Sequence, residues 1–205
     1  MTPTAAVTLN EAQRDCYQEI ANVAMGQAAD RLARLLDVYV ELPIPRVNLI
    51  EATDLHMALQ EARNDEGLSA VCQGFIGSGI AGEALLIFND TSVQDLAALL
   101  NYQGQRSPWT TEELLLDVSS LLTGACINGI GDQLGIHFNQ GLPEIIGRGR
   151  NAAEILQSGP YPWHKTLAIE IHYSVEHMNI DCTLLLLFTE DSVPKLNKKI
   201  DFLLD

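Results

Sequence analysis

The segment GIAGEALLIF at residues 79–88 recurs in altered form as NIDCTLLLLF at residues 179–188, and this repetition decides the fold. Each copy predicts a turn followed by a strand, because an apolar run continues to a phenylalanine. The pattern Ser-Val-x-x-Leu follows both copies, at residues 92–96 and 192–196, where it opens a helix. Two copies about one hundred residues apart indicate a duplicated half-domain, because a solenoid would have shorter and more numerous repeats.

A long helix is predicted in each half. The first spans about residues 9–36, after a capping-box pattern formed by Thr8 and Glu11. The second spans about residues 111–134, after the same pattern formed by Thr110 and Glu113. Each half therefore begins with a capped helix of similar length.

The segments between the helices have strand character. Residues 68–76 and 83–88 predict a hairpin around residues 77–82, and residues 167–175 alternate apolar with polar or small positions before a second hairpin partner at 180–188. Shorter candidates lie at 38–40 and 47–50, around Pro43 and Pro45. The prediction is an α/β single domain over residues 1–205, with internal pseudo-two-fold symmetry and two long helices on one face of a mostly antiparallel sheet. Repeat one spans about residues 8–102, and repeat two about 110–205.

The first helix carries a polar stripe formed by Asp15, Glu19 and Asn22, at positions i, i+4 and i+7. At about 100° per residue, these side chains fall within a sector roughly 60° wide. Gly26 continues the stripe by one turn and leaves a bare position. Spaced polar residues are also typical of an ordinary solvated helix face, so the stripe alone does not establish a site.

Together with Pro45, the stripe has the pattern D-x3-E-x2-N-x22-P. This pattern, and the segment EIANVAMGQAA at residues 19–29, resemble the signature of the CheC family of chemotaxis phosphatases, which dephosphorylate the response regulator CheY. The resemblance implies the CheC fold. It also implies that Asn22 positions the attacking water and that Glu19 pairs with a lysine of the regulator. Asp15 would extend that contact, and Gly26 would allow the partner backbone to approach.

The resemblance implies no cofactor in this chain, because the Mg²⁺ and the phosphoryl aspartate belong to the response regulator. A CheD-like deamidase is a further expected partner. The second half is expected to lack a working site. An offset of 102 residues aligns Asp30 with Asp132, which places Leu121 opposite Glu19 and Gly124 opposite Asn22, with Asp117 opposite Asp15.

Composition excludes several classes of protein. The formal net charge of −15 argues against nucleic-acid binding, which requires clustered Lys and Arg. No apolar run approaches the roughly 18 residues of a membrane span, and the first 15 residues lack the basic and apolar regions of a signal peptide. We therefore expect a cytoplasmic protein. The four cysteines are widely spaced, without a C-x-x-C pair, and are expected to be core residues.

The sequence predicts no metal site. His172 and His177 are five residues apart, so a regular strand would direct them to opposite faces. Gly77–Gly79 and Gly147–Gly149 lack the context of a phosphate-binding loop and are interpreted as turns.

Two alternatives to a phosphatase remain. The first is a non-catalytic chemotaxis adaptor that binds a response regulator or a CheD-like deamidase. The second is a flagellar switch protein, because the switch component FliM contains a domain of the same duplicated fold. Such proteins usually carry a further C-terminal module, and this chain ends at Asp205, directly after the second repeat.

Overall fold

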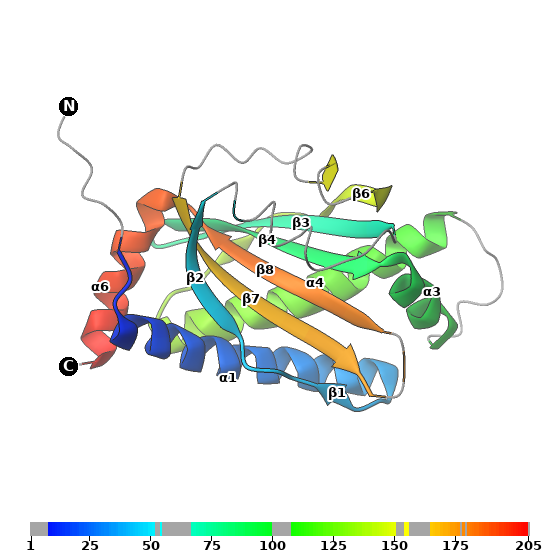
Figure 1. Cartoon of the computed structure of the whole chain (residues 1–205), viewed down its shortest axis with the longest axis horizontal. Coiled ribbons are helices and arrows are strands. Elements are labelled where there is room, and N and C mark those ends of the chain that lie inside the picture. The colour runs from blue at the N-terminus through cyan, green and yellow to red at the C-terminus, as the bar shows by residue number, and fades with distance from the viewer. Residues whose placement is uncertain are drawn as a thin grey trace.

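The computed structural model describes residues 8–51, 54, 67–99, 108–150, 154–155, 165–176, 178 and 180–204. Figure 1 shows one twisted sheet with two long helices, α1 (Glu11–Leu36) and α4 (Pro108–Leu134), against the same face. The shorter helix α3 (Asp90–Leu99) lies at one end of the sheet. A single 3₁₀ turn, η1 (Glu190–Ser192), and helix α6 (Val193–Leu204) lie at the other. The predicted α/β architecture is confirmed.

Helix α1 begins two residues later than the sequence predicted. Its N-cap is Asn10, whose side chain accepts a hydrogen bond from the Gln13 amide at 2.8 Å. The Gln13 side chain in turn accepts from the Asn10 amide at 3.1 Å. The capping box is therefore formed by Asn10 and Gln13, and the prediction of Thr8 and Glu11 was wrong. An amide at the third helical position completes the box as well as a carboxylate does.

Helix α4 begins at Pro108, so Thr110 lies inside the first turn and cannot be its N-cap. Proline suits the first helical turn, since its missing N–H has no partner to lose there. Among the described residues, one helical segment, Thr111–Leu134, is long and apolar enough by composition to cross a membrane. In this fold two-thirds of its most apolar window is buried, as expected for the core helix of a packed domain.

In the described part of the chain, the sheet has eight strands, and all of their pairings are antiparallel. The strands are β1 (Val40–Glu41), β2 (Arg46–Glu51), β3 (Leu68–Gly77), β4 (Ile80–Asn89), β5 (Asn139–Gln140), β6 (Glu144–Arg150), β7 (Lys165–Val175) and β8 (Asp181–Phe188).

The strand order is β1-β7-β8-β4-β3-β5, with β2 also paired to β7 and β6 also paired to β3. Both predicted hairpins are confirmed, although the turn between β3 and β4 needs only Ser78 and Gly79. The interpretation of Gly147–Gly149 as a turn was wrong, because these residues belong to β6.

The two halves exchange their short strands. Strands β1 and β2 of the first half pair with β7 of the second, and β5 and β6 of the second half pair with β3 of the first. The central β4–β8 pair joins the halves at Leu85 and Leu185, which lie directly opposite each other. This arrangement is the predicted pseudo-two-fold symmetry. The halves interlock, because each supplies short strands that pair with the hairpin of the other.

The structure corrects the register between the halves. Leu36 and Leu134 end the long helices 98 residues apart, and each is followed by a residue in the left-handed region, Asp37 (φ 54°) or Gly135 (φ 63°). The strand pairs agree, because Arg46 opposite Glu170 corresponds to Glu144 opposite Cys72, again 98 residues apart. The offset of 102 was therefore wrong by four residues, about one helical turn. Such a slip preserves the helix face, and periodicity alone does not detect it.

The core lies between the helices and the sheet. The helices run antiparallel, and the Gln133 amide donates to the Ile20 carbonyl at 2.9 Å. Gly129 is so close to Ala24 that an added Cβ would lie 3.0 Å from it. Small residues at this crossing let the helices approach closely.

The cysteines belong to this packing. All four are free thiols; Cys126 and Cys182 are buried, and Cys16 and Cys72 are half-buried. Cys126 Sγ lies 2.9 Å from the hydroxyl of buried Tyr173, and burial raises the pKa of Cys126 to about 12. These positions fit the prediction that the cysteines are core residues.

Candidate functional site

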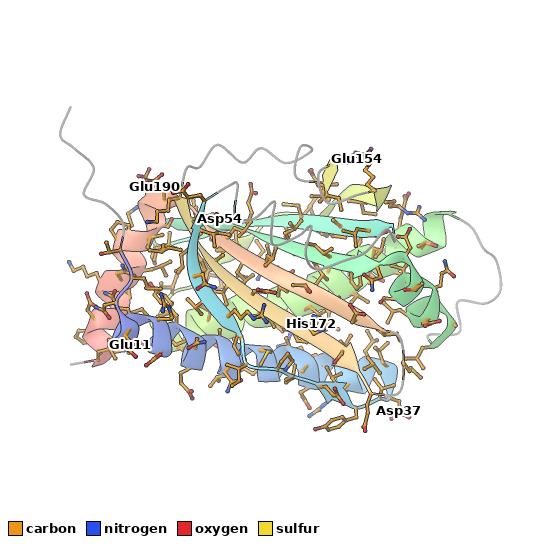
Figure 2. The ribbon with its side chains drawn as sticks, viewed as in Figure 1. Glu11, Asp37, Asp54, Glu154, His172 and Glu190 are labelled. Atoms are coloured by element: carbon orange, nitrogen blue, oxygen red, sulfur yellow. The ribbon has the colours of Figure 1, made fainter. Side chains whose placement is uncertain are left out.

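The predicted stripe lies along the solvent side of α1. Asp15, Glu19 and Asn22 are all exposed, and Tyr17, Ile20 and Ala24 on the opposite side are buried. Glu11 and Asp37, labelled in Figure 2, mark the ends of α1, between which the stripe extends. The helix is therefore fixed by its buried face, and the stripe is held on a rigid support.

The three polar groups of the stripe are free within the described part of the chain. Asp15, Glu19 and Asn22 make neither a hydrogen bond nor an ion pair with another described residue. Glu19 does act on its neighbour: the pKa of Cys16 is raised, mainly by burial and further by the Glu19 carboxylate. Two acids and an amide thus face outward with their bonding capacity unused.

Gly26 leaves open space at the end of the stripe. A Cβ placed there would have no atom within 4 Å. Any side chain at this position would project into the space beside Asn22. The glycine therefore leaves this position of the stripe bare.

Pro45 is brought to the edge of the stripe. The Gln18 side chain donates a hydrogen bond from Nε2 to the Pro45 carbonyl at 3.0 Å, and Pro45 is buried. Gln18 directly precedes Glu19, and Asn22 follows Gln18 by one helical turn. The segment between β1 and β2 therefore lies beside the Asn22 edge of the stripe, which explains physically why a proline 23 residues downstream belongs to the same pattern.

A second stripe occupies the equivalent face of α4. With the corrected offset of 98 residues, Glu113, Asp117 and Ser120 occupy the positions of Asp15, Glu19 and Asn22, and all three are exposed. Gly124 is the counterpart of Gly26, and Pro143 is the counterpart of Pro45. The expectation that Leu121 and Gly124 replace the glutamate and the asparagine was wrong. The second half keeps both acids, the glycine and the proline, and has serine in place of asparagine.

The two stripes differ in how far their polar atoms extend from the helix and in whether another side chain covers the glycine. Asp117 and Ser120 carry their polar atoms closer to the helix than a glutamate and an asparagine do. The Gln140 side chain also covers the bare position, since its Oε1 lies 3.6 Å from where a Cβ of Gly124 would be. Gln140 Nε2 in turn lies 3.5 Å from Asn128 Oδ1. The first stripe is therefore open, and the second is shorter and partly covered.

A cavity of about 750 Å³, which the sequence did not predict, opens away from the first stripe, at the α6 end of the sheet. Its walls include Ile76, Glu83, Leu187 and Glu190, the last of which is labelled in Figure 2. Glu83 Oε2 is buried without a hydrogen-bond partner among the described residues, and burial raises the pKa of this carboxyl group. Its walls hold none of the predicted site residues, so the chemistry proposed below does not involve this cavity.

The described residues contain no group of three or more His, Cys, Asp or Glu side chains arranged to hold a metal ion. His172 Nδ1 lies 3.2 Å from Thr183 Oγ1, a neighbour on the adjacent strand. His177 lies outside the described residues.

No protein-family model matches this chain. Its structure resembles that of FliY from Thermotoga maritima, with a TM-score of 0.69 and 17% identity over 95% of this chain and 98% of that one. A FliM middle domain from H. pylori gives a TM-score of 0.61 at 10% identity, covering 93% of this chain and 99% of that one. The chemotaxis protein CheX from Desulfovibrio desulfuricans gives 0.56 at 14% identity, covering 83% and 99%. The chain therefore has the CheC-like fold shared by FliY and CheX chemotaxis proteins.

Proposed function

We propose that this chain acts in chemotaxis as a phosphatase that hydrolyses the aspartyl phosphate of a CheY-like response regulator. The observation that carries the proposal is the open stripe on α1: Glu19 and Asn22 are exposed and form no hydrogen bond or ion pair with another described residue, and the space over Gly26 is free. The CheC-like fold, shared with a CheX protein, supports the same role. The match of Asp15, Glu19, Asn22 and Pro45 to the family signature supports it further.

The chemistry requires a water molecule in line with the bond between phosphorus and the aspartyl oxygen. The water oxygen forms a new bond to phosphorus, the bond to the aspartyl oxygen breaks with its electron pair, and inorganic phosphate and a free carboxylate result. Such reactions depend on positioning and charge stabilisation more than on a strong base. The Asn22 amide offers both a donor and an acceptor, and so it can orient this water.

The other stripe residues serve docking. Glu19 would pair with a cationic side chain of the regulator, and Asp15, one turn earlier, would extend that contact. Gly26 would admit the regulator backbone. The Mg²⁺ that neutralises the phosphoryl group would be held by the regulator. This chain therefore supplies orientation and needs no cofactor of its own.

Electrostatics limits the rate of association. The net charge of −15 gives no general attraction toward an acidic phosphorylated pocket. Attraction would be local, through Glu19, so we expect slower and weaker association than in a charge-steered pair.

The decisive experiment mixes the protein with each phosphorylated response regulator of its host and follows loss of the phosphoryl group. Asn22→Ala should lower turnover roughly 100-fold or more, because the water loses its orienting group. Asn48→Ala is the matched control, because Asn48 is an exposed asparagine of β2 that faces away from the helices. Full activity of Asn22→Ala, with an unchanged circular dichroism spectrum, would contradict the mechanism.

A second candidate is a non-catalytic binding protein, either an adaptor for a response regulator or CheD-like deamidase, or a flagellar switch-type protein. The structural resemblance to FliY and to the FliM middle domain, with TM-scores of 0.69 and 0.61, supports this candidate. Binding of the phosphorylated regulator without any gain in phosphate release would support this candidate over the phosphatase.

A further inference from the structure

We propose that Ile44 is an apolar anchor that holds the partner protein against the stripe on α1; this inference rests on the proposed function. Ile44 is 79% exposed, although it is a large β-branched hydrocarbon side chain. A single exposed apolar residue is normal on a protein surface. Three further features of Ile44 indicate a role in docking: its position, its restrained backbone and its counterpart in the second half.

Ile44 lies immediately before Pro45, whose carbonyl accepts the hydrogen bond from Gln18 at 3.0 Å. Gln18 adjoins Glu19 and lies one turn before Asn22 on the same side of α1. The segment that carries this exposed side chain therefore passes along the edge of the stripe that Asn22 occupies. A partner that brought its phosphoryl group to Asn22 would cover this residue.

The backbone around Ile44 is held before any partner arrives. Pro43 and Pro45 flank it, and each fixes its own φ and restricts the residue before it. Ordering a loop on binding costs affinity, so an anchor that is already ordered retains more of its binding free energy. An exposed isoleucine between two prolines is thus better suited to docking than one on an unrestrained loop.

The second half repeats the arrangement in weaker form. Leu142 occupies the equivalent position before Pro143 and is 87% exposed. Gly141 replaces the first proline there, and Gln140 covers the adjacent bare position. Two exposed aliphatic residues at symmetry-equivalent positions beside two acidic stripes indicate a shared role in docking. The first half has the more rigid and more open version.

The partner surface that fits this site carries a cationic group for Glu19 next to an apolar patch for Ile44. An apolar contact is also what an acidic protein needs in order to bind an acidic partner. Repulsion between the net charges opposes the complex, and apolar burial is independent of charge sign. Ile44 would then supply affinity that the overall charge does not.

The test measures phosphate release at several concentrations of the phosphorylated regulator, together with Kd for its binding. Ile44→Ala should raise KM and Kd roughly 10-fold or more, as expected for losing the burial of a large aliphatic side chain. The value of kcat should stay unchanged, because Ile44 does not contact the reacting atoms. Ile44→Leu should restore KM, since it keeps the hydrocarbon volume. Ile76→Ala, the same substitution at an exposed isoleucine of β3, is the matched control and should leave KM unchanged.

Each outcome separates this inference from the proposed function. If the parent protein releases phosphate and Ile44→Ala has the parental KM and Kd, the anchor is overturned and the phosphatase stands. If the parent binds without turnover, the phosphatase fails, and Kd of Ile44→Ala still decides the anchor. If the parent neither binds nor hydrolyses any phosphorylated regulator of its host, both are overturned.

Discussion

Glu19 and Asn22 contribute little to holding the fold together, because their side chains face solvent and bond to no other described residue. Substitutions at such positions usually change stability by less than about 0.5 kcal/mol. Loss of activity at these residues can therefore be separated from loss of folding. This separation makes the stripe a practical target for mutagenesis.

Glu19→Lys should weaken binding to a phosphorylated regulator, because it would place like charge against the partner cation. The cost would be several kcal/mol if the pair is desolvated in the complex. Calorimetry at constant ionic strength measures the effect, with Glu41→Lys as a control that makes the same charge change at an exposed residue of β1. Equal affinity of Glu19→Lys and the parent would remove the docking role of Glu19.

Glu83→Gln should stabilise the protein at neutral pH. Burial raises the pKa of Glu83, so the folded protein holds this proton more tightly than the unfolded chain does. The resulting contribution to stability is present below the unfolded pKa, near 4.5, and is lost as the pH rises through the folded pKa.

A glutamine side chain does not ionise, so it is neutral both at pH 7 and below pH 4.5. Thermal unfolding should therefore show a higher Tm for Glu83→Gln than for the parent at pH 7, with the difference shrinking as the pH falls toward 4.5 and lost below it. A difference of the same size at pH 7 and at pH 3.5 would show that charge burial is not its cause.

At the scale of elements, α1 and α4 are equivalent surfaces with different side chains. Both helices end at a residue in the left-handed conformation, and both present acid, acid and polar residue on the outer face. The second copy has Asp117 and Ser120 where the first has Glu19 and Asn22. The polar atoms of Asp117 and Ser120 lie closer to the helix backbone. The same partner would therefore have to approach α4 more closely than α1 to contact them.

Asp117→Glu combined with Ser120→Asn rebuilds the motif on α4. Introduced into Asn22→Ala, where the first stripe is inactive, the pair should restore part of the phosphate release. Adding Gln140→Ala, which uncovers Gly124, should increase the gain. Phosphate release from the phosphorylated regulator measures both steps. If neither variant exceeds Asn22→Ala, the difference between the halves extends beyond the groups on the stripe.

At the scale of the whole molecule, the fold is a single interlocked unit. Strands β1 and β2 pair with β7, β5 and β6 pair with β3, and α1 packs on α4. Every layer of the core therefore contains residues from both halves. The two repeats are related by geometry but depend on each other for stability.

Residues 1–104 and 105–205 should each be unfolded when produced alone, because each half would leave strand edges and one face of its long helix without a partner. Mixing the two fragments should restore structure, as the missing strands and helix are then supplied in trans. Circular dichroism and amide proton dispersion in NMR spectra follow both states. A cooperative unfolding transition for either fragment alone would contradict this interlocked view.

Features that depend on local sequence patterns could be predicted without the structure. The repeat, with similar patterns near both N-termini, predicted both long helices, and apolar runs around short turns predicted both hairpins. The repeat of GIAGEALLIF as NIDCTLLLLF gave the correct offset of one hundred residues for β4 and β8, since Phe88 and Phe188 occupy equivalent places. The spacing of Asp15, Glu19 and Asn22 placed them on one exposed stripe, as the structure has them.

Features that depend on pairing between distant segments became visible only in the folded chain. The sequence did not predict strands β5 and β6. Strand β5 has only two residues, and β6 contains two glycines and lacks regular alternation. Both are strands because they pair with β3. Pairing across the halves also fixed the helix offset at 98 residues and so identified Asp117 and Ser120 as the second stripe. The hydrogen bond from Gln18 to Pro45 brought the segment that contains Ile44 against α1, one helical turn before Asn22. Periodicity specifies which face of an element is buried, but the contacts of that face determine its register.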